Sequence, residues 1–372
     1  MGRAVGPRVA FVVEQTLGHV THSQNLERAV RARPFDAAWL PIEFGPGRLG
    51  RVPLLSQNWS ARASWRARRA LRRADAERGL DAILFHTQVT SLFCVPLMKR
   101  TPSMVCLDAT PRNFDEVGRS YGHRPLEESA LSRLAHGLNL RAIASARALV
   151  AWSEWTRRSL IAEYHADPSK IAVLAPGAAL PFFEIGARRE QRVRRAGPMR
   201  VLFVGGDLAR KGGDLLLRAT REMADVEVHL VTGARVAPRE GVIVHNGITP
   251  NSPQLLALFE DADAFALPTL GDCLPLALME ASAAGLPIVT ADVGACAEAV
   301  VPGQSGMVLR PGDVQSLREA IAGLAADKSR RAAYGRASHA HARRRFDADA
   351  NNRRLLDMIE ELATRSRHRR AA

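Results

Sequence analysis

The fold is decided by the stretch VLFVGGDLARKGGDLLLRA, which covers residues 201–219. It opens with a short apolar run, passes through two glycine pairs and ends in an amphipathic run, which is the order of a strand, a loop and a helix. Gly205 and Gly206 allow a ligand to approach the backbone closely, and the second glycine pair precedes a helix whose first N–H groups are unpaired. The stretch predicts a βα unit of a parallel sheet, with either an anion site at its loop or a tight turn carrying a solvated Arg-Lys pair.

Short apolar strands alternate with amphipathic helices on both sides of this stretch, from residue 8 to 174 and from residue 200 to 325. Such an alternation indicates parallel sheets covered by helices on both faces. It is interrupted at residues 181–198, where two prolines and several arginines are typical of an exposed linker. We therefore expect an α/β fold with two tandem doubly wound Rossmann-like domains, at residues 1–180 and 199–345, that face each other across a ligand-binding cleft.

Two basic segments accompany these domains. Residues 58–79 contain Trp59, Trp65 and seven arginines, which is typical of a helix that lies on an anionic membrane surface or, alternatively, of a solvated helix that packs by its alanine side. After residue 345 we expect a helix at residues 346–364 that packs back towards the first domain. The basic residues 365–372 then form a tail that is expected to fray.

The net charge of +14 comes almost wholly from arginine, because only four of the 52 basic residues are lysines. Lys211, retained inside the glycine-rich loop, therefore stands out. A positive balance fits nucleotides, phospholipid surfaces and nucleic acid alike, but the sequence has no nucleic-acid recognition motif, so nucleic acid is excluded as a partner. The four cysteines form no CxxC pair and no apolar run approaches ~20 residues, so we expect a cytoplasmic protein, peripheral at most to the inner membrane face.

A second motif, PTLGDCLPLALMEASAAGLPIVTADVG, covers residues 268–294. Asp272 lies on a loop after a strand, and Glu280 lies eight residues on, inside an apolar helix. A carboxylate in such surroundings needs a partner, and a ribose offers two neighbouring hydroxyls that it can accept. The alternative is an aspartate at a helix N-terminus and a salt-bridged surface glutamate.

These motifs resemble family four of the retaining glycosyltransferases, whose two Rossmann-like domains form the fold named GT-B. D-x7-E followed by A-x-A-x-G-x-P-x-V resembles the E-x7-E motif of that family, and residues 201–219 look like its phosphate-binding strand and loop. Residues 148–178 are similar to the segment that closes its N-terminal domain. The likeness covers nearly the whole chain, with several motifs in the family's order.

The resemblance assigns roles to individual residues. It implies that Lys211 binds the donor diphosphate, that Glu280 holds the ribose and that Asp272 holds the transferred sugar. Residues 245–248 would lie near the base. The donor would also meet the backbone at the following positions: Gly18, Gly205, Gly206, Leu274, Pro275 and Leu276.

Three positions depart from the family pattern. Asp272 stands where the family has glutamate and is one methylene shorter, so the identity of the sugar is open. Pro275 replaces a glycine and donates no N–H group. Gly206 replaces an arginine, and we expect Arg210 to take over its contact with the donor.

Two strand ends in the first domain carry candidate catalytic groups, Asp108 and His86. Asp108 stands where many relatives have a histidine beside the reacting sugar, and it would orient an acceptor hydroxyl or act as a base. The alternative is an Asx-turn that ends the strand. His19 and His22, on either side of Gly18, are interpreted as a helix N-terminus and surface.

The resemblance implies retaining transfer of a hexose from a nucleotide sugar to the hydroxyl of a glycan, a lipid-linked acceptor or a small molecule, in glycan biosynthesis. No cofactor is expected beyond the donor substrate and no metal, because the DxD strings at residues 261–263 and 347–349 lie at element ends and are interpreted as structural. One alternative is a catalytically impaired protein that still binds nucleotide sugars. The other is a nucleotide-sugar epimerase, which the spacing of the acidic motif disfavours.

Overall fold

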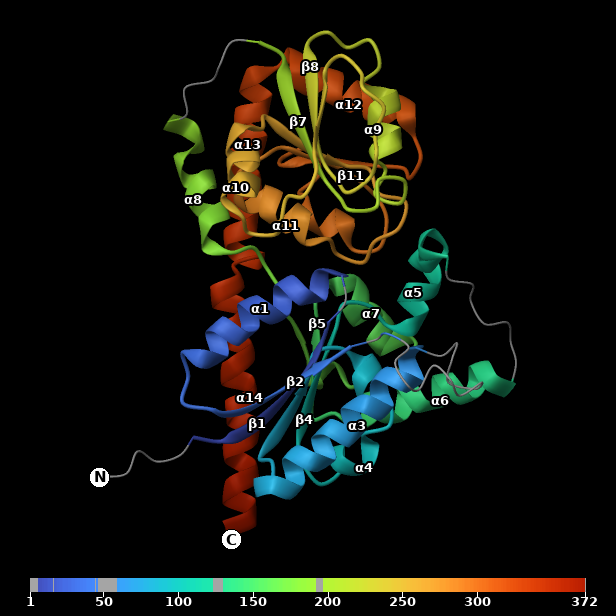
Figure 1. Cartoon of the computed structure of the whole chain (residues 1–372), viewed down its shortest axis with the longest axis vertical. Coiled ribbons are helices and arrows are strands. Elements are labelled where there is room, and N and C mark those ends of the chain that lie inside the picture. Colours follow the sequence, from blue (N-terminus) through green and yellow to red (C-terminus); the bar gives the residue numbers. More distant parts are fainter. Residues whose placement is uncertain are drawn as a thin grey trace. The chain divides into compact units, whose positions relative to one another are not determined.

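The computed structural model describes residues 6–15, 17–43, 45, 59–122, 130–191 and 197–371. From the sequence we also expect acceptor specificity to lie in the loops at residues 43–60 and 111–125. Most of the first loop, the end of the second, part of the linker at 181–198 and Asn58 of the basic helix lie outside the described residues. The chain divides into two compact units (Figure 1). Unit 1 comprises Met1–Arg112, Pro125–Leu174 and Ala350–Ala372, and unit 2 comprises Asn113–Arg124 and Ala175–Asp349.

Unit 1 is built on a six-stranded parallel sheet in the order β2-β1-β3-β4-β5-β6. Its strands are β1 (Arg8–Glu14), β2 (Asp36–Ile42), β3 (Ala82–Phe85), β4 (Ser103–Leu107), β5 (Ala148–Ala151) and β6 (Ile171–Val173). Every residue of β3 and β4 is buried, because helices cover both faces of the sheet and leave no polar side to the central strands.

The side chains of β1 alternate between two apolar cores. Val9 and Phe11 point to the core beneath α1 (Leu17–Arg31) and the C-terminal helix α14 (Ala348–Ala371). Ala10 and Val12 point to the opposite core. That second core lies beneath the following helices: α3 (Trp59–Arg78), α4 (Val95–Met98), α6 (Ala130–Ser145) and α7 (Glu154–Ala162).

Unit 2 repeats the architecture, with a parallel sheet in the order β12-β11-β10-β7-β8-β9. Its strands are β7 (Met199–Val204), β8 (Val226–Val231), β9 (Val242–His245), β10 (Ala264–Leu267), β11 (Ile288–Ala291) and β12 (Gly306–Leu309). One face carries α9 (Gly213–Ala219) and α12 (Val314–Ala326). The other face carries α8 (Leu180–Arg188), α10 (Pro253–Asp261), α11 (Leu276–Ala283) and α13 (Lys328–Arg345) (Figure 1). The predicted pair of doubly wound Rossmann-like domains is confirmed.

The structure differs from the expected linker at residues 181–198. Residues of this stretch form α8, whose Phe182 and Ile185 are buried in unit 2. Phe182 packs edge-on against Phe259 at 5.1 Å, and Arg189 donates hydrogen bonds to three backbone carbonyls of unit 2. The arginines of this stretch suggested an exposed segment, so the sequence pattern did not predict this amphipathic helix.

The C-terminal helix belongs to unit 1 from Ala350 onward. Leu355, Leu356 and Ile359 lie in the core that contains Phe11. The helix continues to Ala371, so the basic tail that was expected to fray is helical over residues 365–371. Among the described residues, no helix combines the length and hydropathy needed to cross a membrane.

Both sheets reverse their strand order at one point, between β1 and β3 in unit 1 and between β7 and β10 in unit 2. The loops that follow two such strands run in opposite directions and leave a crevice at the carboxyl ends of the strands. These two points are therefore where each unit should carry its functional groups.

Candidate functional site

The glycine-rich loop follows β7 at the reversal point of unit 2. Gly212 precedes α9 with a φ of 78°, and a Cβ there would lie 2.0 Å from the carbonyl oxygen of Pro268. Only glycine fits such a position. A Cβ on Gly205 would lie 3.1 Å from the side chain of Lys211, whereas Gly206 has open space around it. The loop therefore holds Lys211 beside the backbone of Gly205 and leaves the arginine position of the resembled family unfilled.

The acidic loop follows β10 and lies against the glycine-rich loop. Lys211 Nζ lies 2.9 Å from both carboxylate oxygens of Asp272. Arg210 adds a contact at 3.3 Å, and the hydroxyl of Thr269 donates to Asp272 at 3.0 Å. Three predicted site residues thus lie together, but in this structure the two cations neutralise the carboxylate.

Arg210 is held more tightly than its expected role as a diphosphate ligand suggests. Its side chain is 9% exposed, and it donates to the carbonyl of Gly271 at 2.6 Å and approaches Asp207 at 3.4 Å. Its guanidinium also lies 4.1 Å from the ring of Tyr121. Tyr121 was not singled out in the sequence, because it lies in the segment expected to bind the acceptor.

The backbone at residues 274–276 leads from the acidic loop into α11. Pro275 is the N-cap of α11, with φ −64° and ψ 131°, and its fixed φ suits that position. Leu274 is buried, and Leu276 opens the helix. Behind them, Gly294 has a φ of 56° and no room for a Cβ, which would lie 2.2 Å from the carbonyl oxygen of Asp272.

Glu280 lies one turn into α11 and is 7% exposed. No hydrogen bond or ion pair engages its carboxylate within the described part of the chain. Burial raises its pKa from 4.5 to about 7. The alternative of a salt-bridged surface glutamate is therefore wrong, and Glu280 is a buried acid in the helix that follows the acidic loop.

Unit 1 gathers polar groups at its own reversal point. His19 and His22 come from the first turns of α1, His86 follows β3 and Asp108 follows β4. His19 Nε2 lies 3.4 Å from Asp108, and His22 Nδ1 lies 2.6 Å from His86 Nε2. The ring of Trp152 packs against all three histidines.

This arrangement corrects the surface interpretation of His19 and His22. The side chain of His19 is 13% exposed and His22 is 3% exposed, and both residues lie inside α1, which begins at Leu17. Gly18 accordingly lies in the first turn of α1. Three histidines that are scattered in the sequence form one buried cluster with Asp108.

The four side chains form two pairs that differ in charge, His19 with Asp108 and His22 with His86. Burial alone would lower the pKa of His19, but the charge and hydrogen bond of Asp108 and the charge of Glu14 outweigh it and raise that pKa to about 9. Burial would raise the pKa of Asp108, and His19 holds it below its usual value instead. Burial and the charge of His19 lower the pKa of His22 to about 3, and burial also lowers that of His86. Asp108 is thus an ionised carboxylate beside an imidazolium, and the other two rings are neutral.

The Asx-turn alternative for Asp108 has partial support. Asp108 Oδ1 accepts the N–H of Ala109 at 2.8 Å, while its other oxygen faces His19. The carboxylate therefore shapes the strand end and also takes part in the cluster.

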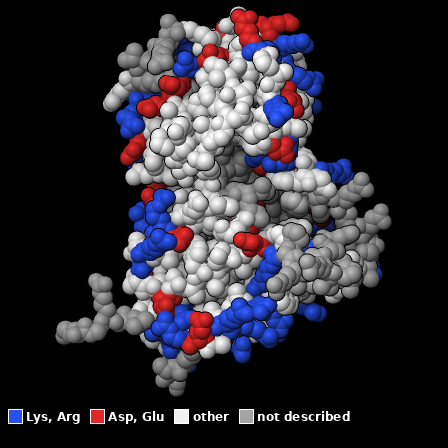
Figure 2. Space-filling view, in the orientation of Figure 1, with Lys and Arg blue, Asp and Glu red and all other residues white. Residues whose placement is uncertain are grey.

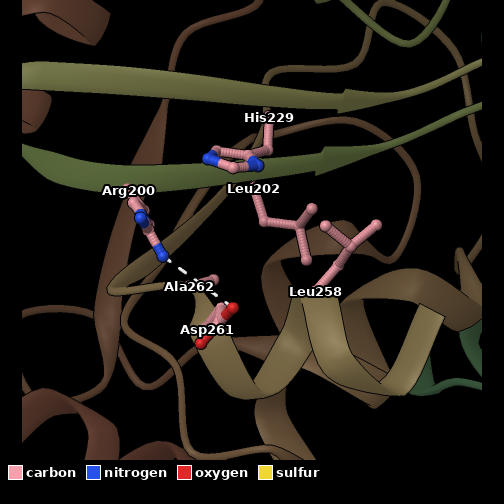
Figure 3. Close-up of a pocket in the computed structure, with 6 residues that line it drawn as sticks. All are labelled: Arg200, Leu202, His229, Leu258, Asp261 and Ala262. Carbon is pink, nitrogen blue, oxygen red and sulfur yellow. Dashed lines mark ion pairs between the residues drawn. The ribbon is translucent and has the colours of Figure 1, made fainter. Parts of the chain in front are cut away.

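The described residues include no group of three or more His, Cys, Asp or Glu side chains arranged to hold a metal ion. In the DxD string at residues 261–263, Asp263 accepts the N–H of Arg200 at 3.0 Å and Asp261 lies 3.8 Å from its guanidinium. Figure 3 shows this ion pair beside Leu202, Leu258 and His229. The depression that they line is too small to admit a ligand, and it lies near the start of β7, whereas the glycine-rich loop follows the end of that strand.

The basic helix α3 buries one side and exposes the other. Ala63, Ala67 and Leu71 pack on the sheet, as the alanine pattern predicted. Trp59 and Trp65 are 43% and 40% exposed, and positive charge gathers over α3 in the lower part of Figure 2. A groove of about 380 Å³ on this helix is lined by Trp65, Arg68, Arg69, Arg72, Arg73 and Ala76.

Comparison with known proteins places both units among glycosyltransferases. The family model described as Glycosyltransferase Family 4 matches residues 18–180, and the model described as Glycosyl transferases group 1 matches residues 198–327. A D-inositol 3-phosphate glycosyltransferase of Corynebacterium aurimucosum is 30% identical over 276 residues, 68% of this chain and 63% of the relative. One of Mycolicibacterium paratuberculosis is 34% identical over 203 residues, 50% of this chain and 46% of the relative. The chain thus spans about half to two thirds of the length of these relatives.

Solved structures share the fold at low identity. Sucrose-phosphate synthase from Thermosynechococcus elongatus superposes with a TM-score of 0.73 at 15% identity, covering 96% of this chain and 99% of the other. HepE of Anabaena in complex with UDP superposes with a TM-score of 0.70 at 16% identity, covering 95% and 100%. Another structure of HepE contains UDP-glucose.

Proposed function

Since the chain belongs to the family 4 glycosyltransferases, we propose that it moves a hexose from a nucleotide sugar to an acceptor hydroxyl with retention of configuration. The observation that carries the proposal is Glu280, a buried carboxylate with no partner among the described residues. Leaving such a group unpaired is costly, and a ribose diol would satisfy it with two hydrogen bonds.

Lys211 supplies the positive charge for the diphosphate. When the bond between the anomeric carbon and the diphosphate oxygen breaks, its electron pair leaves on the diphosphate, which Lys211 and the N–H groups of the glycine-rich loop stabilise. The acceptor oxygen bonds to the anomeric carbon from the same face, and the acceptor proton passes to the leaving diphosphate. Binding of the diphosphate requires Lys211 to share its contact with Asp272, which then lies close to the transferred sugar.

Asp108 is the better of the two candidate catalytic groups in unit 1. Its side chain is 26% exposed, whereas His86 is fully buried behind His22. Held ionised by His19, Asp108 accepts a hydrogen bond from the acceptor hydroxyl and orients it. His86 supports the cluster from behind.

The acceptor and the base of the donor are to be identified by testing a defined set of nucleotide sugars and acceptors. UDP-glucose is the first donor to test because a structural neighbour binds it, and D-inositol 3-phosphate is the first acceptor because of the names of the relatives. Binding of UDP, GDP and ADP, with their sugars, is measured by thermal shift, since a ligand that binds only the native state raises the melting temperature. A melting temperature that no nucleotide sugar raises would refute the proposal.

Transfer itself is measured by NMR of the product. An anomeric configuration equal to that of the donor supports retention, and the opposite configuration refutes it. Because Lys211 and loop N–H groups neutralise the leaving group, the reaction is proposed to need no metal ion, and loss of activity in a chelator would contradict that. Release of nucleotide without transfer to any acceptor would favour the catalytically impaired alternative, and a change of the donor sugar to its epimer would favour the epimerase.

We also propose that α3 binds the anionic surface of the inner membrane from the cytoplasm. Its exposed arginines and tryptophans match lipid phosphates and the headgroup layer, and each arginine near such a surface contributes about 1 kcal/mol. Replacing Arg69, Arg72 and Arg73 together by glutamine should abolish co-sedimentation with phosphatidylglycerol vesicles at low salt. The Arg188→Gln control, at an exposed arginine of unit 2, should sediment like the unmodified protein. No co-sedimentation of the unmodified protein would end the proposal.

A further inference from the structure

A short segment from the first half of the chain packs on the acidic loop of unit 2. Helix α5 (Pro111–Val117) is followed by a 3₁₀ turn, η3 (Gly118–Tyr121), which ends at Gly122 with a φ of 73°. Residues Asn113–Arg124 belong to unit 2 by their contacts, although the rest of that unit begins only at Ala175. The turn brings Tyr121 to the acidic loop.

The contact is closely packed. Ser120 Oγ donates to the carbonyl of Leu270 at 2.7 Å. A Cβ on Gly271 would lie 2.5 Å from Cβ of Ser120 and 2.8 Å from the carbonyl oxygen of Val117. Glycine at position 271 is therefore required by the approach of the segment, which makes η3 a built part of the loop's surroundings.

Asp272 has little capacity left for a sugar hydroxyl. A carboxylate offers about four acceptor positions, and Lys211, Arg210 and Thr269 already contact this one at distances of 2.9 to 3.3 Å. Its side chain is 8% exposed. A ligand that approaches the loop thus meets the groups around Asp272 before it meets the carboxylate.

Tyr121 is a neutral group at the same carboxylate and, unlike Thr269, is not buried. Its hydroxyl donates to Asp272 Oδ1 at 3.3 Å, and its ring lies 4.1 Å from the guanidinium of Arg210. A phenol oxygen that donates its proton to a carboxylate becomes a stronger acceptor, because hydrogen bonds in a chain polarise one another. Tyr121 is partly exposed, whereas the side chain of Asp272 is 8% exposed, so Tyr121 is the more accessible of the two to a ligand.

We propose that Tyr121 is a specificity-determining residue of the donor-sugar subsite, whose oxygen accepts a hydroxyl of the transferred sugar while its proton is held by Asp272. The inference rests on the proposed function and deepens it. It also accounts for the aspartate at position 272, since the tyrosine hydroxyl spans the distance that a shorter side chain leaves.

The test separates the sugar from the nucleotide. Affinities for UDP and for UDP-glucose, or for the GDP or ADP pair if that is the pair bound, are measured by calorimetry for the unmodified protein and for Tyr121→Phe. The variant should bind the nucleotide sugar about tenfold more weakly, the loss expected for one hydrogen bond to a polarised group, and should bind the nucleotide itself within about twofold. The preference among the glucose, galactose and N-acetylglucosamine forms of the donor should also change.

Ser120→Ala is the matched control, because it removes a hydroxyl of the same turn and leaves the phenol in place. It should keep the ratio of the two affinities, and so should any variant that only loosens the segment. An unchanged ratio and preference in Tyr121→Phe, in a protein that does bind nucleotide sugars, would overturn the inference alone. An unmodified protein that binds no nucleotide sugar would overturn the proposed function and the inference together.

Discussion

Replacing Glu280 by glutamine should stabilise the ligand-free protein and weaken nucleotide binding. The side chain is 7% exposed, and burial raises its pKa from 4.5 to about 7. The native state therefore holds this proton more tightly than the unfolded state. The stability that the proton contributes is fully present below pH 4.5 and is lost as pH rises through about 7. The difference between the two pKa values corresponds to about 3 kcal/mol at about 1.4 kcal/mol for each tenfold change in protonation.

Glutamine has nearly the same shape and no charge to desolvate. Urea unfolding of the unmodified protein and of Glu280→Gln, at a series of pH values from about 4 to about 8.5, should show the variant gaining about 3 kcal/mol relative to the unmodified protein over this range. Glu260→Gln, at a carboxylate of α10 that is 52% exposed, is the control and should follow the unmodified protein.

Nucleotide binding should move in the opposite direction. A carboxylate accepts two ribose hydroxyls, whereas an amide oxygen is a weaker acceptor, so the variant should bind UDP about 10- to 100-fold more weakly above pH 7. Below that pH, the UDP affinity of the unmodified protein divided by that of Glu280→Gln should fall about tenfold per pH unit, because the neutral Glu280 must first release its proton. The phosphate of UDP also titrates in this pH range, but its effect on affinity is the same for both proteins and is removed by taking the ratio. A stability difference and an affinity ratio that do not vary with pH would refute the assignment of Glu280 as a buried, ligand-seeking carboxylate.

Three further substitutions test other parts of the structure. Gly294→Ala should lower the free energy of unfolding in urea by several kcal/mol, of which about 1 to 3 kcal/mol come from the positive φ alone. It should also lower the affinity for UDP, because the added Cβ would collide with the carbonyl of Asp272. A stability and a UDP affinity close to those of the unmodified protein would contradict the tight packing behind the acidic loop. Asp108→Asn should bring the pKa of His19 down from about 9 to below 6.5, since burial is the largest influence on that pKa and only the weaker charge of Glu14 then opposes it. The pairing therefore stabilises unit 1 fully below pH 6.5 and less as pH rises through about 9. An NMR titration with an unchanged histidine pKa would refute it. Phe182→Ala should destabilise unit 2 by about 3 to 5 kcal/mol by urea unfolding, and a change under about 1 kcal/mol would restore the view of that stretch as a linker.

Much of the fold was predictable because it depends on local patterns. The alternation of apolar strands with amphipathic helices is repeated along the chain, and Lys211 and Glu280 occur in motifs whose spacing is set by one loop and one helix. The structure places Lys211 on the loop after β7 and Glu280 on the helix after β10, the two strands between which the unit 2 sheet reverses its order.

The rest depends on contacts between distant parts of the chain. Tyr121 reaches Asp272 across 151 residues, and no periodicity indicates such a meeting. His86 contacts His22 across 64 residues, so each histidine taken alone suggested an isolated side chain. The ion pair between Lys211 and Asp272 was not predictable for a different reason: the two motifs predict a separate ligand for each side chain, and only the tertiary structure brings the two loops together.

Because α14 follows unit 2 in the sequence but packs in unit 1, the order of synthesis limits the order in which the two units can fold. Leu355, Leu356 and Ile359 complete the core around Phe11, and they are synthesised after every residue of unit 2. Every residue of unit 2 has been made by Asp349. Domains generally fold as units as they emerge, so unit 2 can close while the sheet of unit 1, most of which is made before unit 2, still exposes part of one apolar face. Unit 1 is thus the unit that most needs a chaperone until α14 has been made.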